Sequence, residues 1–357
     1  MKAVCVLAGV PVMQEMADTM VAAAKLMGAD EVVSGDWLAE DENFATLAKA
    51  VEDNQHELGD KEGRLDSFAI PEILKNNLDA DVLFVAFCPV SAKLMDQMPN
   101  LKAICACRGG IENVDIAAAT KRGVIVVNAA GRNANAVSDF TVGMILACVR
   151  NIAQSNYNIR NGEYSAPLAN ADNIPDMEGK VVGLVGYGHI GGLVAKKLSG
   201  FDVKVITYDP YIPAEALAGT GVEKVEKDEL FKTADIVSVH ARLTPDNVHM
   251  IGAAEIALMK PTAYFVNTAR AGLVDYDALY DALKEHRIAA AALDVHEEEP
   301  LPADTKWLDL DNVVLTGHLG GVTADAQRKS PIIAAKKAIQ YKETGNKRLL
   351  MNPAVAE

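Results

Sequence analysis

The sequence predicts an α/β protein built from two doubly wound parallel-sheet domains. Short apolar runs alternate with helical patterns along both halves of the chain, as expected of strands joined by crossover helices. A strand, a glycine-rich turn, a helix and a second strand follow one another over residues 181–209. The length of 357 residues is typical of two domains rather than one.

Four candidate strands precede residue 130, with helical patterns between them. The strands are expected at residues 3–8, 82–87, 101–107 and 124–128, and the helical patterns near residues 12–27, 43–58 and 114–122. Residues 134–161 then form one long helical pattern with Ala, Val, Met, Ile and Leu on its faces, which is too apolar for a helix in solvent. We expect this helix to pack between domains or subunits.

The second half of the chain repeats the alternation and predicts a second parallel sheet. Its strands are expected at residues 181–186, 203–208, 235–239, 263–268, 289–295 and 312–316. A last helical stretch covers residues 323–343.

Composition and charge exclude several classes of partner. Hydrophobic residues make up 50% of the chain and aromatic residues 5%, which suits a sizeable core rich in Ala, Val, Ile and Leu. The formal net charge of −15 disfavours nucleic acid or an anionic membrane as a partner. No apolar stretch reaches the roughly 20 residues of a membrane span, and the N-terminus lacks the flanks of a signal peptide. We therefore expect a cytoplasmic protein.

The five cysteines agree with that expectation, because most of them sit in apolar runs as buried, reduced thiols do. Cys105 and Cys107 would point to opposite faces of one strand, so they do not form a CxxC redox or zinc motif. Since no second Cys/His cluster accompanies them, no metal site is expected.

Residues 181–209 carry the pattern of a dinucleotide-binding unit. Gly186, Gly188 and Gly191 follow an apolar run and open a helical pattern. The first glycine permits a tight turn, the second lets the backbone approach a pyrophosphate, and the third lets helix and strand pack closely. The phosphates would meet the N-terminus of the helix, where His189 and Ile190 lie.

Asp209 ends the next apolar run, about 20 residues after the glycines. A carboxylate at this place accepts hydrogen bonds from ribose hydroxyls and repels a 2′-phosphate, which favours NAD over NADP. A tight strand-to-helix turn without a ligand is the alternative interpretation, but it leaves the placement of Asp209 unexplained.

Three chemically active side chains follow strands of the second half. Arg270, Glu299 and His318 each come shortly after a strand end, where sites lie in such folds. The guanidinium can clamp a carboxylate and polarise an adjacent carbonyl. The imidazole, with an ordinary pKa of about 6.5, can exchange a proton with the oxygen of that carbonyl, and the glutamate can orient the ring and stabilise its charged form. With a hydride supplied or accepted by nicotinamide, these groups describe the interconversion of a 2-hydroxy acid and a 2-oxo acid.

Each of these residues also has a structural interpretation. A single histidine after a strand is more often structural than catalytic, a lone arginine in a loop is usually solvated, and residues 297–299 could be an acidic turn. Their joint occurrence at strand ends, downstream of a dinucleotide motif, favours the catalytic interpretation.

From about Cys105 to about Gly321, the chain resembles the D-isomer-specific 2-hydroxyacid dehydrogenases. The segments that carry the resemblance are RGGIENVDIAAATKRGVIVVN, GKVVGLVGYGHIGG, LTPDNVHMIG, FVNTARAGLVDYDALYDALKEHRIAAAALDVHEEEP and VVLTGHLGG. The resemblance implies that Arg270, Glu299 and His318 are catalytic. It also implies five further cofactor-binding positions: Val137, Ala241, Thr244, Thr268 and Asp294.

The resemblance further implies the domain organisation. A Rossmann NAD-binding domain is expected at residues 130–324, and a flavodoxin-like substrate domain at residues 1–129 plus 325–357. Members of the family are commonly homodimers held through the cofactor domain, which agrees with the apolar helix expected at residues 134–161.

The substrate loop departs from the family pattern. Arg108, Gly109 and Gly110 stand where Gly-x-Gly is usual, and we expect all three to bind substrate. Our hypothesis is that Arg108 points into the interdomain cleft and binds an anionic or polyhydroxylated part of a small 2-hydroxy or 2-oxo acid. An interdomain ion pair is the alternative.

Two other functions remain open at this point. A phosphoglycerate dehydrogenase-like member is one, because Arg108 could pair with a phosphate. An NAD(H)-sensing scaffold, like the related transcriptional corepressors, is the other, since such relatives keep the same three catalytic side chains.

Overall fold

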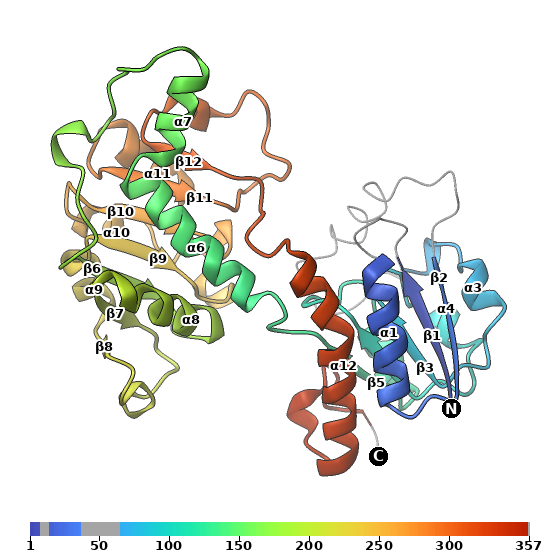
Figure 1. Cartoon of the computed structure of the whole chain (residues 1–357). Coiled ribbons are helices and arrows are strands. Elements are labelled where there is room, and N and C mark those ends of the chain that lie inside the picture. The colour runs from blue at the N-terminus through green and yellow to red at the C-terminus, as the bar shows by residue number, and fades with distance from the viewer. Residues whose placement is uncertain (8–13, 37–64, 356–357) are drawn as a thin grey trace. The chain divides into compact units, whose positions relative to one another are not determined.

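The computed structural model describes residues 1–7, 14–36 and 65–355 (Figure 1). The chain divides into two compact units. Unit 1 comprises Met1–Asn133 and Thr323–Glu357, and unit 2 comprises Ala134–Val322. Each unit has one parallel sheet with helices packed on it, which confirms the α/β class with two parallel-sheet domains.

The described part of unit 1 holds a parallel sheet in the order β2-β1-β3-β4-β5. Its strands are β1 (Lys2–Leu7), β2 (Glu31–Asp36), β3 (Val82–Val85), β4 (Ala103–Ala106) and β5 (Ile125–Asn128). Its α-helices are α1 (Gln14–Leu26), α3 (Glu72–Lys75), α4 (Ala92–Met95), α5 (Ile116–Lys121) and α12 (Ala324–Thr344). The helix α12 comes from the far end of the chain, yet it packs beside α1 and against β4 and β5 (Figure 1). The three central strands are buried along nearly their whole length, as expected of a parallel sheet covered on both faces.

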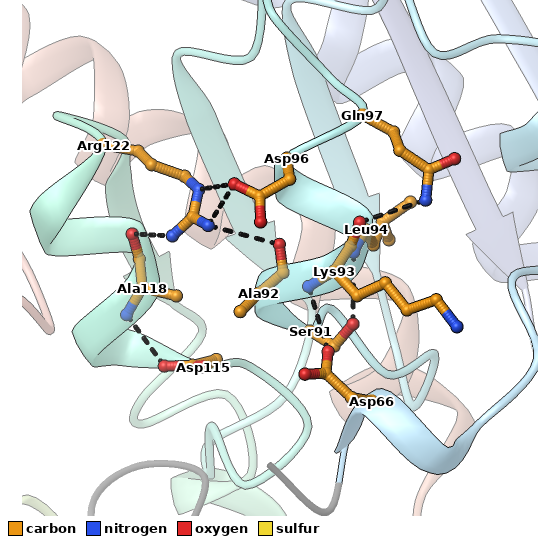
Figure 2. Close-up of polar contacts among 10 residues, drawn as sticks. All are labelled: Asp66, Ser91, Ala92, Lys93, Leu94, Asp96, Gln97, Asp115, Ala118 and Arg122. Atoms are coloured by element: carbon orange, nitrogen blue, oxygen red, sulfur yellow. Dashed lines mark hydrogen bonds and ion pairs between the residues drawn. The ribbon is translucent and has the colours of Figure 1, made fainter.

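Arg122 joins two short helices of unit 1 (Figure 2). Its guanidinium donates to the Asp96 carboxylate through Nε at 3.0 Å and also through Nη2. Nη1 donates to the Ala118 carbonyl at 3.0 Å, and Nη2 donates to the Ala92 carbonyl at 3.4 Å. Asp115 caps the start of α5 by accepting from the Ala118 amide at 2.8 Å. These contacts hold α4 and α5 together.

Unit 2 has a parallel sheet in the order β12-β11-β10-β9-β6-β7-β8. The strands are β6 (Val181–Val185), β7 (Lys204–Tyr208), β8 (Val222–Lys224), β9 (Ile236–Val239), β10 (Tyr264–Asn267), β11 (Ala290–Leu293) and β12 (Val313–Leu315). The helices are α6 (Ala134–Val149), α7 (Ile152–Arg160), α8 (His189–Leu198), α9 (Lys227–Thr233), α10 (Ala253–Leu258) and α11 (Tyr276–Lys284). The chain runs outward from β6 through β7 to β8 and then returns to β9 on the other side of β6, so the strand order reverses between β6 and β9. In open α/β sheets a ligand binds at the carboxyl ends of the strands at such a reversal.

The expectation of one long helix at residues 134–161 is wrong in one respect. It is two helices, α6 and α7, bent by 65° relative to each other. Asn151, at the break, has a φ of 53°, a left-handed conformation that asparagine tolerates better than most residues. Within the described residues no single helix is long and apolar enough to cross a bilayer, and α6 and α7 meet that criterion only as a bent pair.

The edge strands β2 and β8 were not among the expected strands, because their half-exposed residues carry no continuous apolar run. The helical pattern near residues 43–58 lies outside the described residues.

The five cysteines are free and buried, and burial raises the pKa of Cys5 and of Cys148 to about 12.

Candidate active site

The glycine turn between β6 and α8 has a steric reason for two of its glycines. Gly186 has a φ of 98°, and a Cβ on it would lie 2.7 Å from the backbone nitrogen of Ala241. A Cβ on Gly191 would lie 2.4 Å from the carbonyl oxygen of Gly186. Gly188 is the N-cap of α8 and has open space where a Cβ would be, so the backbone is accessible there. His189 and Ile190 are the first residues of α8, and the amides of a first helical turn are the ones that bind anions.

Asp209 lies beside this turn, at the end of β7. Its Oδ2 accepts a hydrogen bond from the Tyr187 amide at 2.8 Å, and its Oδ1 accepts one from the Tyr211 amide at 2.9 Å. The two bonds fix the orientation of the carboxylate against the glycine turn. Because each carboxylate oxygen has a second lone pair, Asp209 can still accept hydrogen bonds from a ligand.

The other predicted cofactor-binding residues surround the same edge of the sheet. Thr268 follows β10, and its hydroxyl lies 2.7 Å from that of Thr141 on α6. Thr141 donates in turn to the Val137 carbonyl at 2.7 Å, so α6 is tied to the end of β10. Ala241 follows β9 and lies against Gly186, and Thr244 begins the short 3-10 helix Pro245–Asn247.

Glu299 and His318 form a hydrogen-bonded pair. The distance from His318 Nδ1 to Glu299 Oε2 is 2.8 Å. Both side chains are partly exposed, His318 at 44% and Glu299 at 37%. The other carboxylate oxygen, Oε1, accepts from the His296 amide at 2.9 Å. Since Nδ1 faces the carboxylate, Nε2 is the ring atom available to a substrate.

The pair shifts the pKa of both of its members. The hydrogen bond to Glu299 raises the pKa of His318, and it outweighs burial and the positive charge of Arg270, which lower it. Burial raises the pKa of Glu299, but the hydrogen bonds from His318 and from the His296 amide lower it by more, and the net shift is downward. The arrangement therefore favours an imidazolium beside a carboxylate.

Arg270 is exposed, and its backbone is held by buried neighbours. The Asn267 side chain donates to the Arg270 carbonyl at 3.0 Å and accepts from the Ala269 amide at 3.0 Å. The side-chain nitrogen of Asn267, Nδ2, also lies 3.1 Å from the Tyr276 hydroxyl. This hydroxyl donates to the Val295 carbonyl at 2.8 Å. The Arg270 guanidinium is engaged through Nη1 with the Ala269 carbonyl at 2.7 Å. A chain of hydrogen bonds therefore fixes the turn after β10 from which Arg270 projects.

Asp294 holds the loop that carries His318. It is 1% exposed, and its Oδ1 accepts from the Thr316 hydroxyl at 2.6 Å and from the Leu319 amide at 2.9 Å. Its Oδ2 accepts from the Gly320 amide at 2.9 Å. Its predicted contact with a cofactor remains a prediction. What the structure assigns to it is the anchoring of residues 316–320.

His296 also supports the pair. The sequence alone indicates only a structural or solvent-facing role for this histidine, and the structure shows that it is buried. Its ring Nε2 lies 2.8 Å from the Thr316 carbonyl, and the residue is 7% exposed. It thus contacts both Glu299, through its amide, and the residue two positions before His318. A histidine three residues after the end of the buried strand β11 was the available signal, but it gave no indication of a partner. Asn267 and Tyr276 were missed for the same reason.

The predicted substrate loop lies in unit 1. Arg108 is 9% exposed, its guanidinium carbon lies 4.3 Å from the centre of the Phe87 ring, and its Nη2 is 3.5 Å from Glu112 Oε2. A Cβ on Gly110 would lie 2.2 Å from Glu112 Oε2, whereas Gly109 has open space. The described residues contain no group of three or more His, Cys, Asp or Glu side chains that could hold a metal ion.

Comparison with known proteins identifies the family. The family model for "D-isomer specific 2-hydroxyacid dehydrogenase, NAD binding domain" matches residues 142–320, within unit 2. The chain is 43% identical to the D-3-phosphoglycerate dehydrogenase of Methanocaldococcus jannaschii over 268 residues, 74% of this chain and 50% of that one. It is 41% identical to the glyoxylate reductase of Thermofilum pendens over 279 residues, 75% of this chain and 80% of that one.

The fold is also that of a solved relative. The structure of D-2-hydroxyisocaproate dehydrogenase matches with a TM-score of 0.74 at 23% identity, over 99% of this chain and 100% of the other. The chain spans about half the length of the M. jannaschii phosphoglycerate dehydrogenase but most of the T. pendens reductase. This chain belongs to the D-isomer specific 2-hydroxyacid dehydrogenases, a family of NAD-dependent oxidoreductases.

Proposed function

We propose that this protein interconverts a 2-hydroxy acid and a 2-oxo acid, using Arg270, Glu299 and His318 as its catalytic residues. The observation that carries the proposal is the 2.8 Å hydrogen bond between His318 and Glu299, in a unit that matches the NAD-binding domain of the family. The hydroxyl carbon would be the site of hydride loss or gain.

Unit 2 fits NAD at its glycine turn. A side chain at Gly186 or Gly191 would collide with backbone atoms, so the turn and α8 pack as closely as a pyrophosphate site requires. The N-terminus of α8 would hold the phosphates, and the carboxylate of Asp209 would accept from ribose hydroxyls. Val137, Ala241, Thr244, Thr268 and Asp294 are the further residues proposed to contact the cofactor. Bound nicotinamide supplies or accepts the hydride.

His318 is the proposed proton donor and acceptor. In reduction, Nε2 of the imidazolium gives its proton to the oxygen of the 2-oxo group; in oxidation, the neutral ring takes the proton of the hydroxyl. Glu299 stabilises the imidazolium through Nδ1, which is why the pKa of His318 is raised. The exposed guanidinium of Arg270 binds the substrate carboxylate and polarises the adjacent carbonyl.

Unit 1 would serve as the substrate domain, with Arg108, Gly109 and Gly110 as substrate-binding residues. Glyoxylate, hydroxypyruvate and 3-phosphohydroxypyruvate are candidate 2-oxo acids, the first because the chain matches a glyoxylate reductase over most of its length, and the last because it matches a phosphoglycerate dehydrogenase. The chemistry of Arg108 favours an acid with a further polar or anionic group.

We also propose a homodimer formed through unit 2. The helix α7 exposes three large side chains, with exposed fractions of 57% at Ile152, 63% at Tyr157 and 49% at Ile159. Exposed apolar groups that cluster on one element commonly mark a protein interface. Light scattering during size-exclusion chromatography would measure the mass, and a monomer at micromolar concentration would contradict the proposal.

A screen of 2-oxo acids with NADH tests the activity. Loss of absorbance at the NADH band should follow addition of at least one member of a panel containing small, branched, hydroxylated and phosphorylated acids. Tight NADH binding without turnover of any member would favour the second candidate, an NAD(H)-sensing scaffold that uses the same nucleotide site.

A further inference from the structure

Two guanidinium groups lie on adjoining backbone segments at the carboxyl ends of β4 and β5 in unit 1. The Arg108 carbonyl accepts from the Ala129 amide at 2.9 Å, and the Ala129 carbonyl accepts from the Arg132 amide at 3.1 Å. The turn after β5 therefore returns to the loop after β4. Both cations lie at the edge of a parallel sheet where ligands bind.

A third cation lies at the same strand ends. Lys337 on α12 donates to Asn128 Oδ1 at 3.1 Å, and Asn128 Nδ2 donates to the Gly109 carbonyl at 2.5 Å. The lysine thus sets the orientation of the Asn128 amide, which holds the loop containing Arg108 and Gly109. Burial lowers the pKa of Lys337.

Arg132 differs from the other arginines of this region in its partners. It is half-buried, and among the residues that the structure describes its guanidinium makes no hydrogen bond or ion pair. Arg122, also in unit 1, has donors engaged with Asp96, Ala92 and Ala118 (Figure 2). Half-buried charges are normally paired, because removing a charge from water without compensation is unfavourable. Arg132 is therefore placed to receive a counter-charge.

Three cationic side chains, Arg108, Arg132 and Lys337, gather at these strand ends although the chain as a whole is acidic. Burial lowers the pKa of Arg132, and the neighbouring charge of Arg108 lowers it further. Within the described residues, Glu112 Oε2 lies 3.5 Å from the Arg108 guanidinium. The formal charge of the chain is −15, so this cluster is a local exception.

We propose that Arg132 and Arg108 together form an anion-binding site that takes a carboxylate or phosphate group, and that this group is a second anion carried by the substrate. The site would then select 2-oxo acids that carry a second anionic group over those with the carboxylate alone. The identification with a substrate rests on the proposed function, whereas the binding of an anion at Arg132 does not.

The first experiment needs no turnover. The thermal midpoint of the full chain is measured in sodium phosphate and in sodium chloride at equal ionic strength, for the wild type, Arg132→Gln and Lys121→Gln. Phosphate should stabilise the wild type and Lys121→Gln, a matched loss of charge at an exposed lysine of the same unit, because a ligand of the native state raises the midpoint. Phosphate also stabilises folded proteins in general, because it is excluded from their surfaces. In Arg132→Gln only this general part should remain, so the midpoint should rise less in phosphate than it does in the other two proteins. The midpoint of this variant in chloride should fall little, because within the described residues the side chain has no hydrogen bond or ion pair to lose.

The second experiment identifies the source of the anion. Reduction by NADH is compared for oxaloacetate against 2-oxobutanoate and for 3-phosphohydroxypyruvate against hydroxypyruvate. In Arg132→Gln the ratio of kcat/KM for the acid with a second anionic group to the acid without one should fall by about 10- to 100-fold, the range for one lost charge-assisted hydrogen bond. Arg132→Lys should restore part of the ratio, and Lys121→Gln should leave it unchanged.

The two readouts separate the outcomes. A fall in the ratio supports a substrate anion, and loss of phosphate stabilisation with an unchanged ratio supports a site for free inorganic anions. The proposal is overturned if Arg132→Gln behaves like the wild type in both experiments. It is also overturned if phosphate does not stabilise the wild type and the ratio of kcat/KM is the same in the wild type and in Arg132→Gln. If no 2-oxo acid is reduced, the proposed function fails and the phosphate experiment alone decides about the anion site.

Discussion

His318 donates from Nδ1 to Glu299 Oε2 at 2.8 Å, although 19 residues separate the two in sequence. The contact fixes one face of the imidazole and leaves Nε2 for the substrate. It also makes the ring a stronger base, because the carboxylate stabilises the imidazolium.

Replacement of His318 should remove proton transfer and leave cofactor binding intact. His318 has a φ of 56°, so asparagine, which tolerates this conformation, is the suitable replacement. His318→Asn should lower kcat by about 10²- to 10⁴-fold, the usual contribution of general acid–base catalysis. His286→Asn is a matched control, since His286 is exposed and has a φ of 51°. Stopped assays give kcat, and fluorescence titration gives the Kd for NADH; full activity of His318→Asn would remove the histidine from the mechanism.

Neutralising Glu299 should move the pH profile toward acid. Reduction needs the imidazolium, so its rate falls as pH rises through the pKa of His318, and Glu299 raises that pKa. In Glu299→Gln the fall should occur at lower pH, and the rise of the oxidation rate, which needs the neutral ring, should also begin at lower pH. Profiles of kcat/KM against pH measure both limbs. The exposed neighbour Glu298→Gln should reproduce the wild-type profile, and an unshifted profile in Glu299→Gln would contradict the coupling.

Much of this arrangement could be predicted from the sequence, because strand ends are local features. The apolar runs ending at Val185, Val266 and Leu315 mark strands, and the carboxyl ends of these strands share one edge of a parallel sheet. Polar residues just beyond them, such as His318, were therefore expected on one edge. The α/β class followed from the same alternation of runs and helical patterns.

The partners of those residues could not be predicted, because they depend on packing between distant segments. In the sequence, Asn267 is only a polar residue near the end of an expected strand. Nothing in the neighbouring sequence indicates that its side chain contacts Tyr276 and the backbone of Arg270. Arg132 reads as an ordinary loop arginine; its half-burial and its proximity to Arg108 appear only when the turn after β5 meets the loop after β4.

Asp209 should determine the choice between NAD and NADP. Its carboxylate lies beside the glycine turn, bonded to the Tyr187 and Tyr211 amides, and its charge would repel a 2′-phosphate. Asp209→Asn removes the charge and keeps one of the two oxygen acceptors, so one of the two backbone amides keeps its partner. The ratio of kcat/KM with NADH to that with NADPH should fall by about tenfold or more, equivalent to about 1.4 kcal/mol. An unchanged ratio, with unchanged thermal stability, would contradict the assignment of Asp209 to the ribose.

The Tyr276 hydroxyl should stabilise unit 2 and position Arg270. It is buried, accepts from Asn267 and donates to the Val295 carbonyl, so Tyr276→Phe leaves buried polar groups without a partner. The expected loss is about 1–3 kcal/mol in the free energy of unfolding. Tyr280→Phe is the matched control, because both rings pack edge-on against Trp307 but, within the described residues, the Tyr280 hydroxyl makes no hydrogen bond. Denaturant titration measures the loss, and equal stability of the two variants would show that the hydroxyl of Tyr276 has no such role.

Two adjacent glycines in α8 should respond oppositely to alanine. A Cβ on Gly191 would lie 2.4 Å from the Gly186 carbonyl oxygen, a backbone atom that cannot move without opening the turn. Gly191→Ala should therefore weaken NADH binding and lower the thermal midpoint. A Cβ on Gly192 would meet the Tyr187 ring at 3.8 Å, an ordinary contact, so Gly192→Ala should bind NADH normally and gain about 0.5–1 kcal/mol from the reduced freedom of the unfolded chain. Calorimetric titration with NADH and thermal unfolding compare the two. Normal NADH binding by Gly191→Ala would mean that the turn opens without affecting the cofactor, and the close approach of α8 to β6 would then have no part in binding it.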